Sequence, residues 1–353
     1  MIAAIVVIVL LLLVYRQGVL FRADRFLVCT QETERLLAEP GETMRLSVTV
    51  TNRSLWLFPY VRVTAFFADG LEPVKENTER KSALANSVSR SMMILPRRTV
   101  TYRIPVVCRK RGRYPVQDLL MQSGDSFGLS SRTFRMEGRG EIVVIPAKEE
   151  SETFPETVGG FLGNISVRRF IHEDPVLSAG FREYTGREPL KQISWPQSTK
   201  GIGLMVRTPD HTADPSICLI LNIDSDAPDR EALIEHCYVQ ARTLCELLEQ
   251  RGFAYRMVTN AAAAGALSDT SAVQHGSGQE HYRLIMERLG RASYTCERSF
   301  AALVQYAAEQ NDNTAGYLII TPSYSDRLPG HLLVRLSAQS GSEPVRFYGE
   351  DTA

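Results

Sequence analysis

The chain has 353 residues, of which 44% are hydrophobic and 23% are charged. This composition is typical of folded protein, and the length allows two or three domains, each able to bury a core. The 40 basic side chains balance 40 acidic ones, which argues against nucleic acid as a partner because binding to phosphates needs an excess of Lys and Arg.

Residues 1–21 form the first predicted element. Ile2–Val14 is an uninterrupted apolar run, and about 20 residues suffice to cross a bilayer. A cleaved signal peptide is the alternative, but no basic residue precedes the run and no small-residue cleavage site follows it. Because Arg16, Arg22 and Arg25 follow the run, the positive-inside rule places the bulk of the chain in the cytoplasm. The sequence therefore predicts a single-pass protein of the cell membrane.

Residues 26–147 alternate between apolar and polar side chains in short runs such as MRLSVTVTN and YVRVTAFFA. Gly and Pro turns separate these runs, and this pattern predicts an antiparallel β-sandwich of the immunoglobulin-like kind. One basic cluster comprises Arg109, Lys110, Arg111 and Arg113. It either contacts anionic headgroups or is a solvated strand edge that discourages aggregation. A tight turn is predicted over Gly124–Leu129, where Asp125 caps the turn and Phe127 plugs the sandwich.

Residues 148–213 are predicted to be a connector. Its distinctive part is Phe181–Arg207, which crowds charged side chains around Tyr184 and Trp195 without helical or strand periodicity. Such a stretch is either a structural clasp between two domains, with both aromatic side chains packed beneath it, or a surface that docks a partner. These two interpretations remain open at the level of sequence.

Residues 214–353 are predicted to alternate strands and helices. Ser216–Ile223 is an apolar run typical of a strand buried in a parallel sheet, and Arg230–Arg251 has apolar residues at helical spacing. Ala261–Gly278 is predicted to be a loop and Leu328–Ala338 a helix. The alternation predicts a doubly wound α/β domain.

Asn222, Asp224 and Asp226 follow the first strand of this domain at alternate positions. Three oxygen-bearing side chains on one turn could hold Mg²⁺ or another divalent cation. The alternative is that Asn222 and Asp224 end the strand and that Asp226 or Asp229 caps the following helix.

Signs of catalysis are weak in this sequence. The histidines show no HExxH spacing, and neither a GxSxG elbow nor a phosphate-binding glycine loop occurs. We therefore predict that the chain is not an enzyme. The six cysteines have no CxxC pair, which indicates reduced, buried thiols rather than a disulfide framework.

Three motifs in order resemble the domain-of-unknown-function 58 family. The matching residues are Arg111, Gly112, Arg113 and Tyr114; Gly124, Asp125, Phe127 and Gly128; and Arg182, Glu183, Tyr184, Gly186, Ile193 and Trp195. The resemblance implies a bacterial, membrane-anchored protein with a von Willebrand factor A-like domain after the sandwich. It also implies a MoxR-type AAA+ ATPase as partner, and it aligns Asn222, Asp224 and Asp226 with a degenerate form of the family's metal site.

These observations lead to one functional expectation and one alternative. We expect a membrane-anchored interaction or scaffold protein whose von Willebrand A-like domain docks a protein partner during assembly or maturation of a complex. The alternative is a cell-envelope protein, either a metal-dependent hydrolase or a structural protein that binds envelope polymer.

Overall fold

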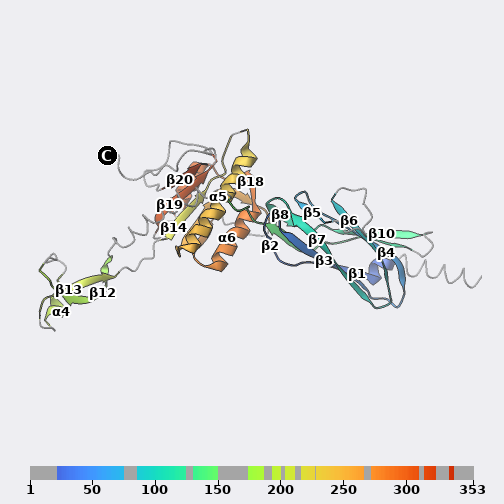
Figure 1. Cartoon of the computed structure of the whole chain (residues 1–353), viewed down its shortest axis with the longest axis horizontal. Helices are drawn as coiled ribbons and strands as arrows, with labels where there is room; N and C mark the ends of the chain where they lie inside the picture. Colours follow the sequence, from blue (N-terminus) through green and yellow to red (C-terminus); the bar gives the residue numbers. More distant parts are fainter. Residues whose placement is uncertain are drawn as a thin grey trace, which may run out of the picture. The chain divides into compact units, whose positions relative to one another are not determined.

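The computed structural model describes residues 22–74, 86–124, 130–149, 174–186, 193–199, 203–210, 216–226, 228–265, 272–309, 314–322 and 334–337. Internal contacts divide the chain into two compact units, which are described separately (Figure 1). The first unit comprises Met1–Ala147, Ala263–Ala266 and Glu287–Ala292. The second unit comprises Lys148–Ala262, Leu267–Met286 and Ser293–Ala353.

Two four-stranded antiparallel sheets build most of the first unit. One sheet has the order β1-β3-β7-β5, with strands β1 (Leu27–Thr33), β3 (Thr43–Asn52), β7 (Thr99–Cys108) and β5 (Leu71–Pro73). The other has the order β10-β9-β4-β6, with strands β10 (Ser131–Met136), β9 (Leu119–Gly124), β4 (Phe58–Phe66) and β6 (Ser87–Ile94). A smaller sheet joins β2 (Leu37–Ala38), β11 (Glu141–Val144) and β8 (Gly112–Pro115), and the short helix α2 (Ala23–Phe26) precedes β1.

Alternation along the strands explains why the two sheets pack together. In β3 the side chains of Met44, Leu46, Val48 and Val50 are buried, and the residues between them face away from the core. Because successive side chains of a strand point to opposite faces, one face of each sheet is apolar. Buried residues from both sheets share one hydrophobic core. The first unit is therefore an antiparallel β-sandwich.

One end of this sandwich carries two neighbouring connections, residues 53–57 between β3 and β4 and residues 95–98 between β6 and β7, which together we call the loop tip. The fully buried Asn52 holds them together. Its Nδ2 donates to the carbonyl oxygens of Trp56 (2.7 Å) and Leu95 (3.0 Å), and its Oδ1 accepts from the backbone N–H (2.9 Å) and hydroxyl (2.8 Å) of Ser54. The amide thus uses all four of its hydrogen-bonding positions.

We expect the substitution Asn52→Ala to lower the free energy of unfolding of the first unit by about 2 kcal/mol, because two carbonyls and a buried N–H lose their partner. Denaturant unfolding followed by Trp56 fluorescence measures this. Arg45→Ala, on the exposed side of the same strand, serves as control and should change stability by less than about 0.5 kcal/mol. Equal effects of the two substitutions would contradict the role of Asn52.

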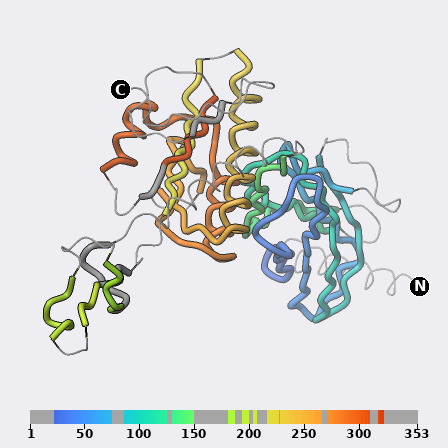
Figure 2. Tube along the Cα trace, turned by 60° about the vertical axis from the view of Figure 1, so that its left-hand side comes forward, coloured from blue at the N-terminus to red at the C-terminus, as the bar shows by residue number. Residues whose placement is uncertain are grey.

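The second unit contains a five-stranded sheet with the order β17-β15-β14-β19-β20. The described part of residues 216–322, which includes most of this sheet, runs from yellow to red in Figure 2. Its strands are β14 (Ser216–Leu221), β15 (Tyr255–Thr259), β17 (Ala272–Gly276), β19 (Thr314–Thr321) and β20 (Val334–Ser337). Neighbours among β15, β14, β19 and β20 pair in parallel, and β17 pairs antiparallel with β15. All six residues of β14 are buried, as expected for a central strand covered on both faces.

Three longer helices accompany this sheet: α5 (Arg230–Gln250), α6 (Gln279–Arg291) and α7 (Phe300–Glu309). Helix α5 buries Ile234, Cys237, Ala241, Leu244 and Leu248 at helical spacing, which is the amphipathic pattern that predicts it. Leu303 and Ala307 of α7 join a core with residues of β14, β15 and β19. The strands β16 (Ala261–Ala263) and β18 (Ala292–Cys296) form a separate two-stranded sheet.

The second unit differs from the sequence prediction at several places. Inside the predicted connector, Asp174–Glu183 and Met205–Asp210 are strands β12 and β13. Residues 261–278, predicted as a loop, contain β16 and β17. Val334–Ser337, inside a predicted helix, is strand β20, paired in parallel with β19. Small and polar side chains give residues 261–278 little periodic signal, and the four residues of Val334–Ser337 are too few to show a period, so pairing with a neighbouring strand decided both segments. The sheet is consequently mixed, not parallel throughout.

The predicted transmembrane helix, residues 1–21, lies outside the described residues. Within the part of the chain that the structure describes, no helix is long and apolar enough to cross a membrane. The predicted single-pass placement in the cell membrane is therefore not supported. The apolar length of Ile2–Val14 and the arginines after it do not by themselves distinguish a spanning helix from another apolar segment.

Candidate functional site

The hairpin of β12 (Asp174–Glu183) and β13 (Met205–Asp210) contains the stretch that crowds charged and aromatic residues. Arg182 pairs with Val206 and Glu183 with Met205, and Ile193 forms an isolated bridge to Val206 from the other side. Val206 and Ile193 are 1% and 6% exposed, so they form a small core inside the hairpin.

A short helix, α4 (Trp195–Ser198), is fastened to this hairpin. The N–H of Ser194 donates to the carbonyl of Met205 (2.8 Å), and the N–H of Met205 donates to the hydroxyl of Ser198 (2.9 Å). Pro196 lies in the first turn, where its missing N–H has no cost. These bonds fix the place from which the indole of Trp195 projects.

The side chain of Trp195 is exposed, contrary to the prediction that Tyr184 and Trp195 are packed beneath a clasp. Trp195 is 63% exposed, Leu204 is 40% exposed, and Tyr184 is half-buried. Arg182 and Glu183 are exposed as well. Gly186 has φ +90° with open space around it, which identifies a turn that a side chain would strain. The hairpin core is too small to cover an indole, so Trp195 remains at the surface.

Asn222, predicted as a metal ligand, instead joins three strand ends. Its Nδ2 donates to Thr321 Oγ1 (3.0 Å), and its Oδ1 accepts from Asn260 Nδ2 (2.7 Å) and from the N–H of Asp224 (3.0 Å). Asn260 Oδ1 accepts from the N–H of Ile223 (2.9 Å). Sequence reasoning missed Asn260, although its position directly after β15 is a signal of the same kind.

This arrangement does not fit a metal ion. Both lone pairs of the Asn222 carboxamide oxygen are used by N–H donors. Asp224 is half-buried and Asp226 is exposed. Within the described residues, no group of three or more His, Cys, Asp or Glu side chains could hold a metal ion. The geometry supports the alternative in which these residues end a strand.

The basic cluster of the sandwich is held by protein groups. Arg111 donates to the carbonyl oxygens of Leu289 (2.8 Å) and Ala292, and Arg113 Nε lies 2.6 Å from Glu141 Oε2. Arg109 pairs with Glu72 at 2.8 Å. Arg111 and Arg113 are therefore held by protein groups, whereas Arg109 and Glu72 form a solvated pair, with side chains 61% and 59% exposed. Contact of the cluster with anionic headgroups stays a prediction.

The described residues of the other sandwich motifs have packing roles. The hydroxyl of Tyr114 donates to the carbonyl of Lys110 (2.9 Å), and a Cβ added to Gly70 would lie 2.2 Å from that hydroxyl. Gly112 has φ +149°, and Gly124 ends β9 against Tyr60. Asp125, Phe127 and Gly128 lie outside the described residues.

The thiols are not poised for nucleophilic attack. Burial raises the pKa of Cys29 and Cys237 to about 12 and of Cys108 and Cys218 to about 11. The pKa of Cys296 is also raised, mainly by burial. All six cysteines are free and five are buried, which confirms the predicted buried thiols. Reaction needs the thiolate, which these pKa values disfavour at neutral pH.

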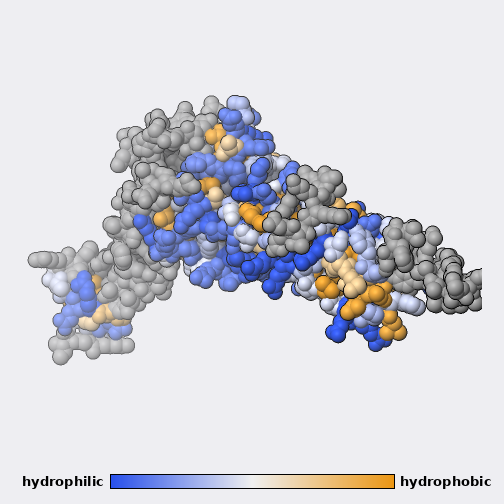
Figure 3. Space-filling view, turned by 45° about the vertical axis from the view of Figure 1, so that its right-hand side comes forward, coloured by the Kyte–Doolittle hydropathy of each residue, from blue (hydrophilic) through white to orange (hydrophobic). Residues whose placement is uncertain are grey.

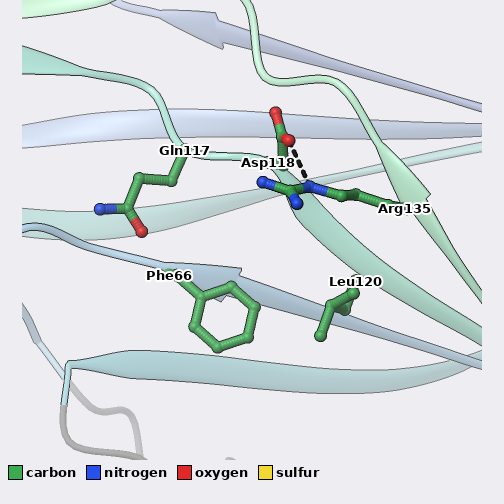
Figure 4. A pocket seen from close by; sticks show the side chains of 5 residues that line it. All are labelled: Phe66, Gln117, Asp118, Leu120 and Arg135. Carbon is green, nitrogen blue, oxygen red and sulfur yellow. Dashed lines mark hydrogen bonds and ion pairs between the residues drawn. The ribbon is translucent and has the colours of Figure 1, made fainter.

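A shallow pocket of about 440 Å³ lies on the sandwich (Figure 4). Phe66 and Leu120 line its apolar side, and Gln117 and the ion pair of Asp118 with Arg135 line its polar side. Hydrogen bonds from the N–H of Gly138 and from Arg135 lower the pKa of Asp118. Because the carboxylate is already paired, the pocket has no poised acid or base.

Known proteins resemble this chain over part of its length and at low sequence identity. No family model matches the chain, and no curated protein matches it. Among solved structures, Escherichia coli alpha-2-macroglobulin is 16% identical with a TM-score of 0.23, covering 32% of this chain and 16% of that one. The seventh ScaB type I cohesin of Pseudobacteroides cellulosolvens is 11% identical with a TM-score of 0.23, covering 35% of this chain and 96% of that one. The CARDB domain of the PF1109 protein of Pyrococcus furiosus is 11% identical with a TM-score of 0.19, covering 32% and 94%.

The comparisons overturn the resemblance to the domain-of-unknown-function 58 family. No family model matches the chain, that of this family included. The prediction of a von Willebrand A-like doubly wound domain is therefore wrong, and the second unit is described by its mixed sheet and three helices. Short motifs in order misled because glycine turns and aromatic plugs recur wherever strands need them.

Proposed function

We propose that the chain is a protein-binding module and that the hairpin of β12 and β13 with α4 is its docking surface. The observation that carries the proposal is the 63% exposure of Trp195 on a helix held by backbone hydrogen bonds. Tryptophan is enriched among the residues that dominate binding energy, and it loses little conformational entropy on binding when its backbone is already fixed.

The hairpin itself supports the same conclusion. An isolated two-stranded hairpin is only marginally stable in water, and the described core of this one consists of Ile193 and Val206. Leu204 beside α4 is 40% exposed. Covering Trp195 and Leu204 with a partner would remove apolar surface from water and complete the core that the hairpin lacks.

The catalytic alternative lacks a comparable observation. A metal-dependent hydrolase would use Asp224 and Asp226, but the oxygen of Asn222 that would share the metal is committed to other bonds. That the chain is not an enzyme stays a prediction. A MoxR-type ATPase as partner also stays a prediction, but the resemblance that implied it is not supported.

The substitution Trp195→Ala tests the proposal on the full chain. We expect the melting temperature to stay unchanged and the affinity for the partner to fall at least about thirtyfold, as for an interface residue that contributes 2 kcal/mol or more. A photo-reactive residue at position 195 should first identify the partner, because it cross-links only what covers the indole. Position 45, exposed on strand β3 of the first unit, provides the cross-linking control, because position 199, four residues after Trp195, lies on the same face of α4.

Two outcomes would contradict docking at this hairpin. If Trp195→Ala unfolds the second unit, the tryptophan belongs to a structural clasp. If the photo-reactive residue at 195 gives no more adduct than the residue at 45, no partner covers the indole.

A further inference from the structure

The loop tip of the sandwich exposes large apolar side chains. Leu55 is 70% exposed, Trp56 49% and Leu57 39%, and the neighbouring Met93 and Leu95 are 58% and 50% exposed. Hydrophobic side chains gather at an end of the sandwich unit in Figure 3. Five such residues side by side are more than the scattered apolar surface of a soluble domain requires.

These side chains are presented by a fixed backbone. Asn52 ties the carbonyls of Trp56 and Leu95 together, and the N–H of Arg97 donates to the carbonyl of Ser54 (3.1 Å). The N–H of Trp56 donates to the hydroxyl of Ser54 (3.1 Å). The bonds hold the backbone of both connections in place, so the apolar residues project from an ordered structure and not from a frayed loop.

Arginines surround the apolar residues. Arg53, Arg97 and Arg98 belong to the loop tip and are exposed. The N–H of Arg53 donates to the carbonyl of Phe26 (2.9 Å), which brings the exposed Arg22 and Arg25 of the α2 region to the same end. Within residues 22–26, 53–57 and 95–98, the acidic residue is Asp24. The loop tip thus combines exposed apolar side chains with exposed arginines.

We propose that the loop tip seats in the headgroup region of an anionic lipid bilayer. Tryptophan prefers the boundary between hydrocarbon and headgroups, and each arginine near an anionic surface strengthens binding about fivefold. A second copy of the chain fits less well, because two cationic surfaces repel each other. The contact is peripheral and, among the described residues, is made by these two connections.

The two tryptophans of the chain allow a direct test. In the full chain with Trp195→Phe, Trp56 is the remaining fluorescent tryptophan. In the full chain with Trp56→Phe, Trp195 is the remaining one. Vesicles of equal parts phosphatidylserine and phosphatidylcholine with brominated acyl chains quench an indole that enters the bilayer. We expect quenching and a blue shift for Trp56 and neither for Trp195. Reversing Arg53, Arg97 and Arg98 to Glu should weaken vesicle binding at least about a hundredfold.

Three results would overturn the proposal. Trp56 that is not quenched by the anionic vesicles does not enter a bilayer. Quenching that is equal with pure phosphatidylcholine and unaffected by charge reversal would mean that the apolar run Ile2–Val14 brings the chain to lipid. Trp56 already blue-shifted without vesicles would mean that another part of the chain, or a bound acidic protein, covers the loop tip.

Discussion

Replacing Asn260 by alanine is expected to lower the free energy of unfolding of the second unit by about 4 kcal/mol. Asn260 is 1% exposed, accepts from the N–H of Ile223 (2.9 Å) and donates to Asn222 Oδ1 (2.7 Å) and the carbonyl of Arg298 (3.0 Å). Alanine leaves a buried N–H without an acceptor and deprives two oxygens of a donor, and each unsatisfied buried group costs about 1–3 kcal/mol.

Hydrogen exchange of peptides that cover β14 and β15 measures this effect, since it reports on one unit even when two units unfold separately. Asp226→Ala is the control because Asp226 follows the same strand but is exposed. We expect the control to change protection by less than about 0.5 kcal/mol. Equal protection in the two variants would show that Asn260 does not hold the strand ends together.

Replacing Arg291 by alanine is expected to lower the free energy of unfolding of the first unit by about 3 kcal/mol. Arg291 is 5% exposed and pairs with Glu141 and, at 2.9 Å, with Glu287. Removing one partner from a buried ion pair leaves uncompensated charge and costs about 3–5 kcal/mol. We place the loss at the lower end because the two carboxylates keep some contact with water. Arg283→Ala, in an exposed pair with Glu280 on the same helix, should cost less than about 0.5 kcal/mol.

The pH dependence of the Arg291 variant gives a second measurement. Hydrogen bonds from Arg291 and then from Arg113 lower the pKa of Glu141 in the folded state. A carboxyl with a lowered folded pKa contributes stability above its unfolded pKa of about 4.3, and loses it as pH falls through the folded pKa. The difference between the native chain and Arg291→Ala should therefore shrink below about pH 4. A difference that stays constant down to that range would argue against charge as its origin.

The sandwich was predictable because its signal is local. Alternation in Thr43–Asn52 and Thr99–Cys108 places apolar residues on one face whatever the partner strand is. The continuous apolar run at Ser216–Leu221 likewise indicated a strand buried on both faces. Val334–Ser337 was misassigned because a four-residue strand has too few positions to distinguish the two periods.

The candidate sites were less predictable from sequence. Asn222 was identified correctly as a strand-end residue, but its partners Asn260 and Thr321 lie 38 and 99 positions away. Nothing in the local pattern indicates that the Asn260 side chain would donate to the Asn222 oxygen that a metal ion would need. The arginines Arg111 and Arg113 looked like a surface cluster for the same reason, since their carbonyl and carboxylate partners are distant in sequence.

The sequence by itself determined the strands of the sandwich, the buried strand β14 and helix α5, and which side chains are apolar enough to be buried, because periodicity and composition act over a few residues. The tertiary structure alone decided that Trp195 is exposed, that Asn222 is bound to Asn260, and that Leu55, Trp56 and Leu95 share one end of the sandwich. These outcomes depend on which distant segments meet, and on how much surface the meeting covers. Side chains two positions apart can therefore differ completely in environment.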